Sequence, residues 1–236
     1  MSRTKTIGVV GGMGPMATVE FFRRLVAKTD AASDQEHVHI LIDNDPSVPD
    51  RTGALLRGEE NPVPALQRMA RRLEAAGAEL LAMPCNTAHA FIEEIRVAVS
   101  IPVLDMIEET AAAVDGGPVG LLATDGTIET GLYQRALATR RIDTVSPGAT
   151  DQATVMEIIR AVKAGEDLDR LTGRIAPVIN RLAAAGAKAA VAACTELSLL
   201  AGKRLEIRWI DALDVLVRAA LRHAGARSVV NGEETR

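Results

Sequence analysis

The chain contains one short pattern twice, and each copy ends in one of its only two cysteines. The first copy runs from Gly77 through an apolar stretch to Cys85, and the second runs from Gly186 through a similar stretch to Cys194. Each cysteine stands eight residues after its glycine. A helix that ends at the glycine, followed by a buried strand, would deliver each cysteine to the carboxyl end of a strand. Ligands gather at these strand ends in open α/β sheets, so both thiols are predicted to lie at a binding edge.

Further matching positions extend this repeat over most of the chain. Like residues recur at similar separations in the pairs Gly8 and Gly120, Leu73 and Leu182, and Asp105 and Asp211. The repeat predicts an α/β fold of two pseudo-symmetric lobes, each a short mainly parallel sheet flanked by helices, with the active site in the cleft between them. We expect residues 1–102 and 208–236 to form the first lobe and residues 103–207 the second. The final strand, expected at 207–210, and the helix after it would return to complete the first lobe.

Composition narrows the classes of function that suit the chain. Of 236 residues, 47% are hydrophobic, which is enough for a substantial core. The net charge is −4 and no basic stretch occurs, so a nucleic-acid partner is not expected. No apolar run reaches membrane-spanning length. Neither a C-x-x-C motif nor a Cys/His zinc spacing is present, so no metal is expected. The sequence predicts a soluble cytoplasmic protein with reduced thiols.

A glycine-rich loop follows the first expected strand, at residues 6–10. Gly12-Met13-Gly14-Pro15-Met16-Ala17 matches the dinucleotide fingerprint G-x-G-x-x-A, and Asp43 ends the next strand, where a ribose-binding acid would stand. An NAD(P)-dependent dehydrogenase that uses the Gly12-Met13-Gly14 loop is therefore a competing interpretation from another class. It leaves the two matched cysteines unexplained.

Three other polar residues have both a structural and a functional interpretation. Arg51 lies on a polar loop at the expected ligand edge, where a solvated surface charge and a ligand-binding role are about equally supported. Lys163 falls near the end of a helix, where favourable interaction with the helix dipole suffices to explain it. His89 follows Cys85 on an expected helix, where a local hydrogen-bonding role is favoured over that of a general base.

The paired thiols suggest a chemistry of their own. A buried cysteine is usually an inert, small hydrophobe, but this explains poorly why both fall at matching strand ends followed by polar residues. Asn86 and Thr87 follow one thiol, and Thr195 and Glu196 follow the other. Backbone N–H groups at the helix starts that follow would favour thiolate. Inversion of a carbon centre needs a base on one face and an acid on the other, and a thiolate/thiol pair can exchange these roles.

Taken together, several motifs resemble the aspartate/glutamate racemase superfamily, specifically its aspartate and amino-acid racemase branch. The motifs extend from the first strand into the last third of the chain: Gly11-Gly-Met-Gly-Pro15, Ser33-Asp-Gln-Glu-His37, Pro49-Asp-Arg-Thr52, Met83-Pro-Cys-Asn-Thr-Ala-His89, Val162-Lys-Ala-Gly165 and Ala193-Cys-Thr-Glu196. As a set they are specific to this superfamily, although each is weak alone.

This resemblance implies a cofactor-independent racemase of amino acids, dimeric like most relatives, that works by two-base proton transfer. It implies that Cys85 and Cys194 are the catalytic pair, with the first-lobe thiol serving the D isomer and the second-lobe thiol the L isomer. It further implies a set of residues that line the substrate site, namely Met13, Arg51, Asn86, Thr87, Thr127, Lys163 and Thr195.

Departures from the family pattern bear on the substrate. Glutamate racemases typically carry Asp-Ser-Gly after the first strand and a histidine directly after the second Cys-Thr, whereas this chain has Gly11-Gly12-Met13 and Glu196. The differences favour aspartate as the substrate. A broad-specificity amino-acid racemase and a glutamate racemase stay open as alternatives, and so do hydantoin racemase and maleate isomerase activities. A two-lobed solute-binding protein would not need either thiol.

Overall fold

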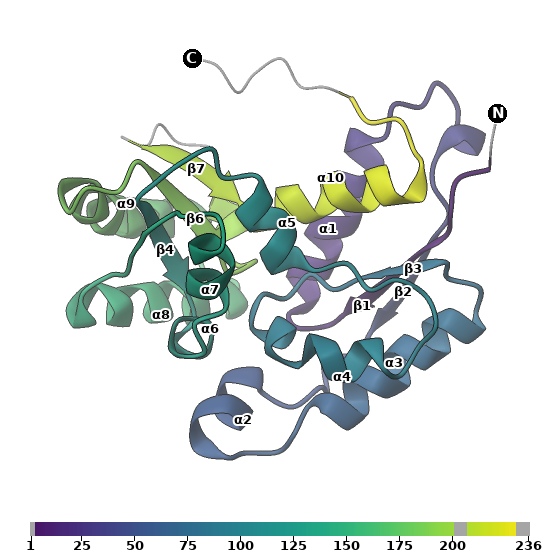
Figure 1. Cartoon of the computed structure of the whole chain (residues 1–236), viewed down its shortest axis with the longest axis horizontal. Coiled ribbons are helices and arrows are strands. Elements are labelled where there is room, and N and C mark those ends of the chain that lie inside the picture. Colours follow the sequence, from purple (N-terminus) through teal and green to yellow (C-terminus); the bar gives the residue numbers. More distant parts are fainter. Residues whose placement is uncertain (1–2, 201–206, 230–236) are drawn as a thin grey trace.

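The computed structural model describes residues 3–200 and 207–229, which form two lobes, each built around a parallel sheet (Figure 1). The first sheet has the order β2-β1-β3 and the second has the order β5-β4-β6-β7. The strands are β1 (Ile7–Gly11), β2 (Ile40–Asn44), β3 (Leu80–Ala82), β4 (Val119–Ala123), β5 (Thr144–Val145), β6 (Ala189–Ala193) and β7 (Arg208–Asp211). The two-lobed α/β prediction is confirmed.

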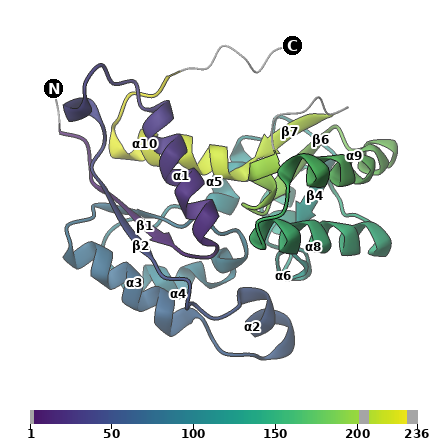
Figure 2. The same ribbon diagram turned by 180° about the vertical axis from the view of Figure 1, so that it is seen from behind.

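Helices cover both faces of each sheet, as Figures 1 and 2 show from opposite sides. On the first sheet, α1 (Pro15–Lys28) and α10 (Ala212–Ala224) pack on one face, and α3 (Val63–Ala75) and α4 (Ile92–Arg96) on the other. On the second sheet, α8 (Ala149–Lys163) and α9 (Leu168–Ala184) oppose α5 (Met106–Ala112) and α7 (Leu132–Ala138). Because both faces are covered, β1, β3, β4 and β6 are buried throughout and read as continuous runs of small and apolar residues.

The repeated glycines of the central strands let a helix approach closely in both lobes. A Cβ atom added at Gly8 would lie 3.3 Å from Cβ of Leu73, and one added at Gly120 would lie 3.3 Å from Cβ of Leu182. The leucines belong to α3 and α9, which precede the two cysteine-bearing strands. The glycine and the leucine of each copy of the repeat therefore pack against each other, at equivalent places in the two lobes.

The repeated aspartates begin two equivalent helices. Asp105 accepts hydrogen bonds from two backbone N–H groups in the first turn of α5, and Asp211 does the same for α10. A carboxylate at this position satisfies orphan helix donors and suits the helix dipole. The two helices pack against each other, α5 on the second sheet and α10 on the first, and so link the lobes.

Two expectations about strands are wrong. The expected boundary at residue 208 places β7 in the first lobe, but β7 pairs in parallel with β6 and so extends the second sheet; only α10 returns to the first. The apolar sequence Ile101-Pro-Val-Leu-Asp105 predicts a further strand, but the structure has only an isolated bridge there, between Leu81 and Val103. Two backbone hydrogen bonds join the segments there, from the N–H of Leu81 to the carbonyl of Pro102 and from the N–H of Leu104 to the carbonyl of Leu81. Pro102 itself has no N–H group to donate.

Several short elements were not expected from the sequence. They include β5, α2 (Arg51–Arg57), α6 (Asp125–Glu129) and three 3₁₀ helices at Asp34–Glu36, Thr87–Phe91 and Leu197–Leu200. Two of the 3₁₀ helices follow the cysteines, where regular helices were expected. The sequence also predicts a helix from about Ile107 that ends at Gly116-Gly117, and the structure has the shorter α5 in its place. Such short segments carry too few residues to show a periodic pattern.

Candidate active site

A small pocket between the lobes is lined by both cysteines. Cys85 follows β3 and Cys194 follows β6, and each has only 6% of its surface exposed. The pocket joins eight of the nine expected site residues: Met13, Arg51, Cys85, Asn86, Thr87, Lys163, Cys194 and Thr195. Four further residues line it that were not assigned to the substrate site, namely Asp50, Thr52, Thr124 and Glu196.

Thr127, the ninth expected residue, lies behind the pocket wall. Its hydroxyl is 2.9 Å from that of Thr87 and 3.1 Å from that of Thr124, and Thr127 is fully buried. Thr87 comes from the first lobe, whereas Thr124 and Thr127 come from the start of α6 in the second. This hydroxyl cluster fixes the Thr87 side chain across the lobe boundary. Thr124 could have been found from the sequence, because it directly follows the strand equivalent to β1.

The two cysteines differ in their surroundings. The thiol of Cys194 donates to Oε2 of Glu196 at 2.9 Å, and Glu196 is itself 4% exposed. Burial and the Glu196 carboxylate raise the pKa of Cys194 well above the usual range of a thiol. The backbone N–H of Glu196 lowers the pKa of Cys194, as expected of the segment after the thiol, but burial and the carboxylate outweigh this contribution.

Lys163 stands at the end of α8, where the second lobe meets the pocket. Its Nζ is 3.8 Å from Oε1 of Glu196, and 43% of its side chain is exposed. Burial by itself lowers the pKa of Lys163, but the neighbouring acidic groups, of which the Glu196 carboxylate contributes most, outweigh it, so the pKa is raised. The ammonium therefore faces the pocket as a stable positive charge.

Arg51 is not a solvated surface charge. It opens α2, is 9% exposed, and its Nη1 donates to the carbonyl oxygens of Val48 and Pro49 at 3.0 and 2.8 Å. Its Nε atom is buried without a hydrogen-bond partner. A guanidinium held by backbone carbonyls, with a free donor in a pocket, is arranged to bind an anion.

Asn86 directly follows the first cysteine and is held from the other lobe. The hydroxyl of Tyr133, on α7, donates to Oδ1 of Asn86 at 2.5 Å. Burial raises the pKa of Tyr133 far above its usual range, so its hydroxyl keeps its proton. With Oδ1 engaged, the Nδ2 donor of Asn86 is buried without a partner. Nothing in the local sequence around Tyr133 marks it for this role.

His89 supports the cysteine loop and does not face the pocket. Its Nε2 accepts from the backbone N–H of Met106, so its proton lies on Nδ1, which donates to the carbonyl oxygen of Cys85 at 2.8 Å. Burial lowers the pKa of His89, which keeps the ring neutral. The prediction of a local hydrogen-bonding role for His89 is confirmed.

The features that suggested a dinucleotide have other partners. The backbone N–H of Gly12 donates to the hydroxyl of Thr18, and a Cβ atom at Gly12 would lie 2.3 Å from the carbonyl oxygen of Asp45. Asp43 forms an ion pair with Arg72 at 2.7 Å. The glycine loop thus serves close packing of backbone, and the acid is engaged by an arginine, so neither contact supports nucleotide binding.

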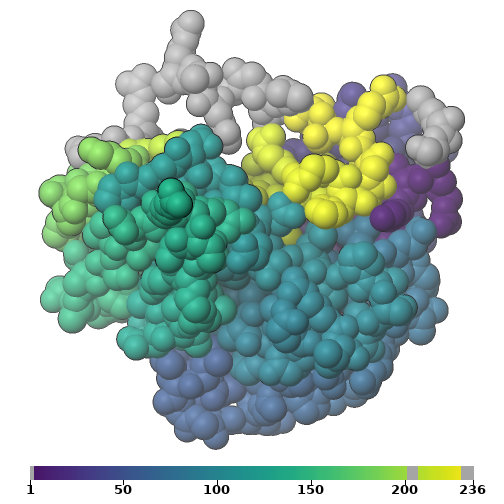
Figure 3. All heavy atoms as spheres, in the orientation of Figure 1, coloured from purple at the N-terminus to yellow at the C-terminus, as the bar shows by residue number. Residues whose placement is uncertain are grey.

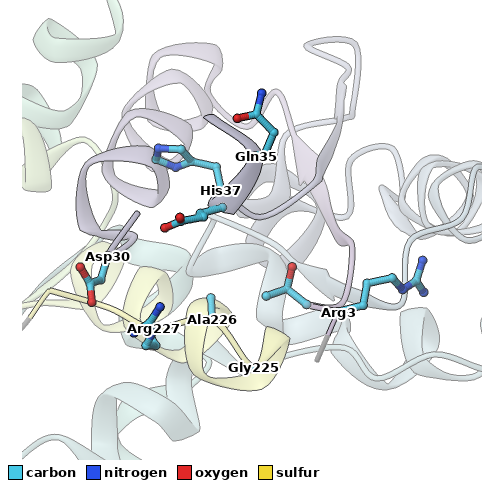
Figure 4. Close-up of a pocket in the computed structure, with 9 residues that line it drawn as sticks. Arg3, Asp30, Gln35, His37, Gly225, Ala226 and Arg227 are labelled. Atoms are coloured by element: carbon cyan, nitrogen blue, oxygen red, sulfur yellow. The ribbon is translucent and has the colours of Figure 1, made fainter. Parts of the chain in front are cut away.

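A larger cavity lies elsewhere in the first lobe. It has a volume of about 590 Å³, against about 20 Å³ for the pocket between the lobes. Figure 4 shows its lining, which includes Arg3, Asp30, His37 and Arg227. None of the expected site residues lines this cavity, and its lining mixes acidic and basic side chains. The larger cavity is therefore not the candidate active site.

Neither a membrane span nor a metal cluster is present in residues 3–200 and 207–229. No described helix has the length and apolar character needed to cross a membrane. Within the same residues, no group of three or more His, Cys, Asp or Glu side chains is placed to hold a metal ion.

The pocket holds the parts that proton exchange at a carbon centre requires. Two thiols reach it from equivalent strand ends of opposite lobes, two cationic side chains flank them, and buried donors of Arg51 and Asn86 are unpaired. One thiol can remove a proton while the other delivers one, as general acid–base catalysis requires.

Comparison with known proteins gives a consistent family. The Asp/Glu/hydantoin racemase family matches residues 10–220. The aspartate racemase of Picrophilus torridus is 37% identical, with 95% of this chain and 96% of that chain covered and a TM-score of 0.87. An aspartate racemase homologue from Pyrococcus horikoshii shares the fold at 22% identity and a TM-score of 0.75, with 94% and 99% covered. The broad specificity amino-acid racemase RacX of Bacillus subtilis is 28% identical over 222 residues, 91% of this chain and 96% of that one. The chain therefore belongs to the Asp/Glu/hydantoin racemase family, the cofactor-independent isomerases that racemise amino acids.

Proposed function

We propose that this protein is an aspartate racemase that interconverts the L and D isomers by two-base proton transfer between Cys85 and Cys194. One observation carries the proposal: the only two thiols of the chain enter one pocket from equivalent strand ends of opposite lobes. By family analogy, Cys85 takes the α-proton of the D isomer and Cys194 that of the L isomer. Each thiol returns a proton when the reaction runs the other way.

The remaining groups would hold the amino acid between the thiols. Asn86, Thr87 and Thr195 supply hydrogen-bonding groups beside them, and Met13 supplies apolar contact. The α-carboxylate would take the free Nδ2 donor of Asn86. Thr127 would act through Thr87, whose hydroxyl it contacts.

Two positive charges support an acidic substrate. Aspartate has a second carboxylate, whose burial without a cationic partner would be costly. Arg51 has an unpaired Nε and Lys163 carries a stable charge at the pocket mouth, so either can receive it. The name of the Picrophilus torridus relative agrees with this choice, whereas that of RacX makes a broader amino-acid range the second candidate.

Chiral chromatography after incubation with L-aspartate, L-glutamate, L-alanine and L-lysine tests the proposal. D-aspartate should appear fastest, and either single variant, Cys85→Ala or Cys194→Ala, should abolish its formation. Circular dichroism of both variants should match the wild type, because deleting one small buried thiol costs little. A Cys85→Ala protein that racemises aspartate at the wild-type rate would contradict the two-base proposal.

We also propose that activity needs no cofactor, so it should survive exhaustive dialysis, a chelator and a carbonyl reagent that traps pyridoxal phosphate.

We further propose that the protein is a homodimer and acts in the cytoplasm. Support for a dimer comes from α1, where Met16, Val19, Phe22 and Val26 are exposed along one stretch of helix. Light scattering should give the mass of two chains.

A further inference from the structure

We propose that Glu196 is a positioning residue that holds the proton on Cys194 in the free enzyme, so that Cys194 starts as the acid and Cys85 as the base. The inference rests on the proposed two-base function and deepens it. It assigns the resting protonation state of the thiol pair to one carboxylate.

The contacts of Glu196 support this role. Its Oε2 accepts from Sγ of Cys194 at 2.9 Å and from the hydroxyl of Thr195 at 3.4 Å. A carboxylate only accepts hydrogen bonds, so the sulfur beside it must carry the proton to make this contact. Loss of that proton would place a thiolate against a carboxylate in a site from which water is excluded, which is unfavourable.

The second oxygen of Glu196 is held differently. Oε1 is buried without a hydrogen-bond partner, and the nearest cation, Nζ of Lys163, is 3.8 Å away. The lysine is half-exposed, so it neutralises the carboxylate only in part. It also attracts a Cys194 thiolate and so opposes the effect of Glu196. The burial and the carboxylate outweigh it.

Four further titratable groups lie near Cys194 on other elements. Cys85 stands opposite in the first lobe, Asp50 and Arg51 lie at the start of α2, and Tyr133 lies on α7. Tyr133 keeps its proton and contributes no charge. Arg51 is a cation, which attracts a thiolate and does not disfavour one. Glu196 is therefore the one acidic side chain placed by a described contact to discriminate between them.

The internal repeat makes the discrimination visible. Two residues after Cys194 the chain has Glu196, and at the equivalent place after Cys85 it has Thr87. Thr87 is neutral, and its hydroxyl is engaged with Thr124 and Thr127. The two halves of the site thus match in backbone and thiol but differ in one carboxylate. A symmetric pair would leave the location of the single proton undetermined.

The ratio of kcat/KM values cannot report this asymmetry. Enantiomers have equal free energies, so kcat/KM must be the same in both directions for the wild type and for every variant. Direct titration of the thiol avoids this constraint and requires no turnover.

The experiment uses Cys85→Ala as the background, so that Cys194 is the only thiol. Thiolate absorbance and the rate of alkylation by iodoacetamide are measured against pH. Adding Glu196→Gln should lower the apparent pKa of Cys194 by about 1 or more, and so raise its alkylation rate at neutral pH roughly tenfold. Asp50→Asn is the matched control, because Asp50 lines the same pocket but accepts from the N–H of Gly53 and not from a thiol. It should shift the titration far less.

A pKa of Cys194 that stays in place or rises in Glu196→Gln would overturn the inference. If that variant fails to fold, Glu196→Asp draws the carboxylate away from the sulfur and should give a smaller decrease. The infrared S–H band of the background protein supplies a second readout, and a band typical of a free thiol would contradict the contact. If the wild type racemises amino acids but the pKa of Cys194 does not change in Glu196→Gln, only this inference is wrong. If Glu196→Gln lowers that pKa but the wild type has no racemase activity, the proposed function is wrong.

Discussion

The role of Arg51 could not be decided from its sequence context alone. Its sequence context allowed a solvated charge or an anion ligand equally. The deciding fact is its burial, which arises because α2 begins at Arg51 and the preceding carbonyls of Val48 and Pro49 hold the guanidinium. The cysteines, in contrast, were predictable at this scale, because the repeat gave each thiol its strand end.

Replacing Arg51 tests how the second carboxylate is bound. Arg51→Leu should lower kcat/KM for aspartate by a factor that corresponds to about 2–5 kcal/mol of activation free energy, the typical cost of truncating one member of a buried charged pair. The same variant should lower kcat/KM for alanine much less. Arg57→Leu is the matched control, because Arg57 lies on the same helix but is exposed and paired with Glu59. Steady-state kinetics with both amino acids decide the matter.

Equal losses for aspartate and alanine would mean that Arg51 holds the α-carboxylate that both share. No loss for either would contradict a ligand-binding role altogether.

The contacts of Tyr133 and Glu196 could not be predicted from the sequence. Glu196 was expected near the second sulfur, but its bond to Cys194 and the Tyr133 bond to Asn86 depend on side-chain geometry that spacing does not encode.

Among elements, long periodic segments could be predicted and short ones could not. The helices α3, α8 and α9 and the strands that precede the cysteines follow directly from apolar periodicity and glycine positions. β5 has only two residues, and α2 and α6 are too short to show a period. The sheet to which β7 belongs is decided by pairing with β6, a long-range choice that its own four residues do not determine.

His89 joins the Cys85 loop to the start of α5, and its buried neutral ring predicts a dependence of stability on pH. The folded pKa lies below the ordinary value of 6.5, so as the pH falls below 6.5 the unfolded chain binds a proton that the folded chain does not. The stabilisation is therefore fully present above 6.5 and is lost progressively below it.

Urea unfolding of the wild type and His89→Gln at pH values above and below 6.5 checks this. The wild type should be the more stable protein at the higher pH, because the variant lacks the ring that joins Cys85 to Met106. The difference in the free energy of unfolding should shrink at the lower pH. A difference that does not change with pH would show that His89 contributes by packing alone.

At the scale of the whole molecule, the site exists only where the lobes meet. Figure 3 shows the lobes abutting, with the segment around α2 below the second lobe. Contact there is close: a Cβ atom at Gly126 of α6 would lie 3.2 Å from Cα of Thr52 in α2. The remaining volume of about 20 Å³ has room for little more than one water molecule.

The two lobes could be predicted from the sequence repeat, because duplication of a fold leaves its pattern in the spacing of residues. How closely the lobes approach could not be foretold. That distance depends on contacts such as the one between Gly126 and Thr52, which pair residues from unrelated positions in the two copies.

Hydrogen exchange at the α-carbon during racemisation in deuterium oxide tests the central claim most directly. Each enantiomer of aspartate is supplied separately, and mass spectrometry after chiral separation follows both isomers in early turnover. If Cys85 and Cys194 act from opposite faces, the product in either direction carries deuterium delivered by the second thiol, whose proton exchanges with solvent, while unreacted substrate keeps its original hydrogen. A product that retains the original hydrogen would contradict two-base transfer between the thiols.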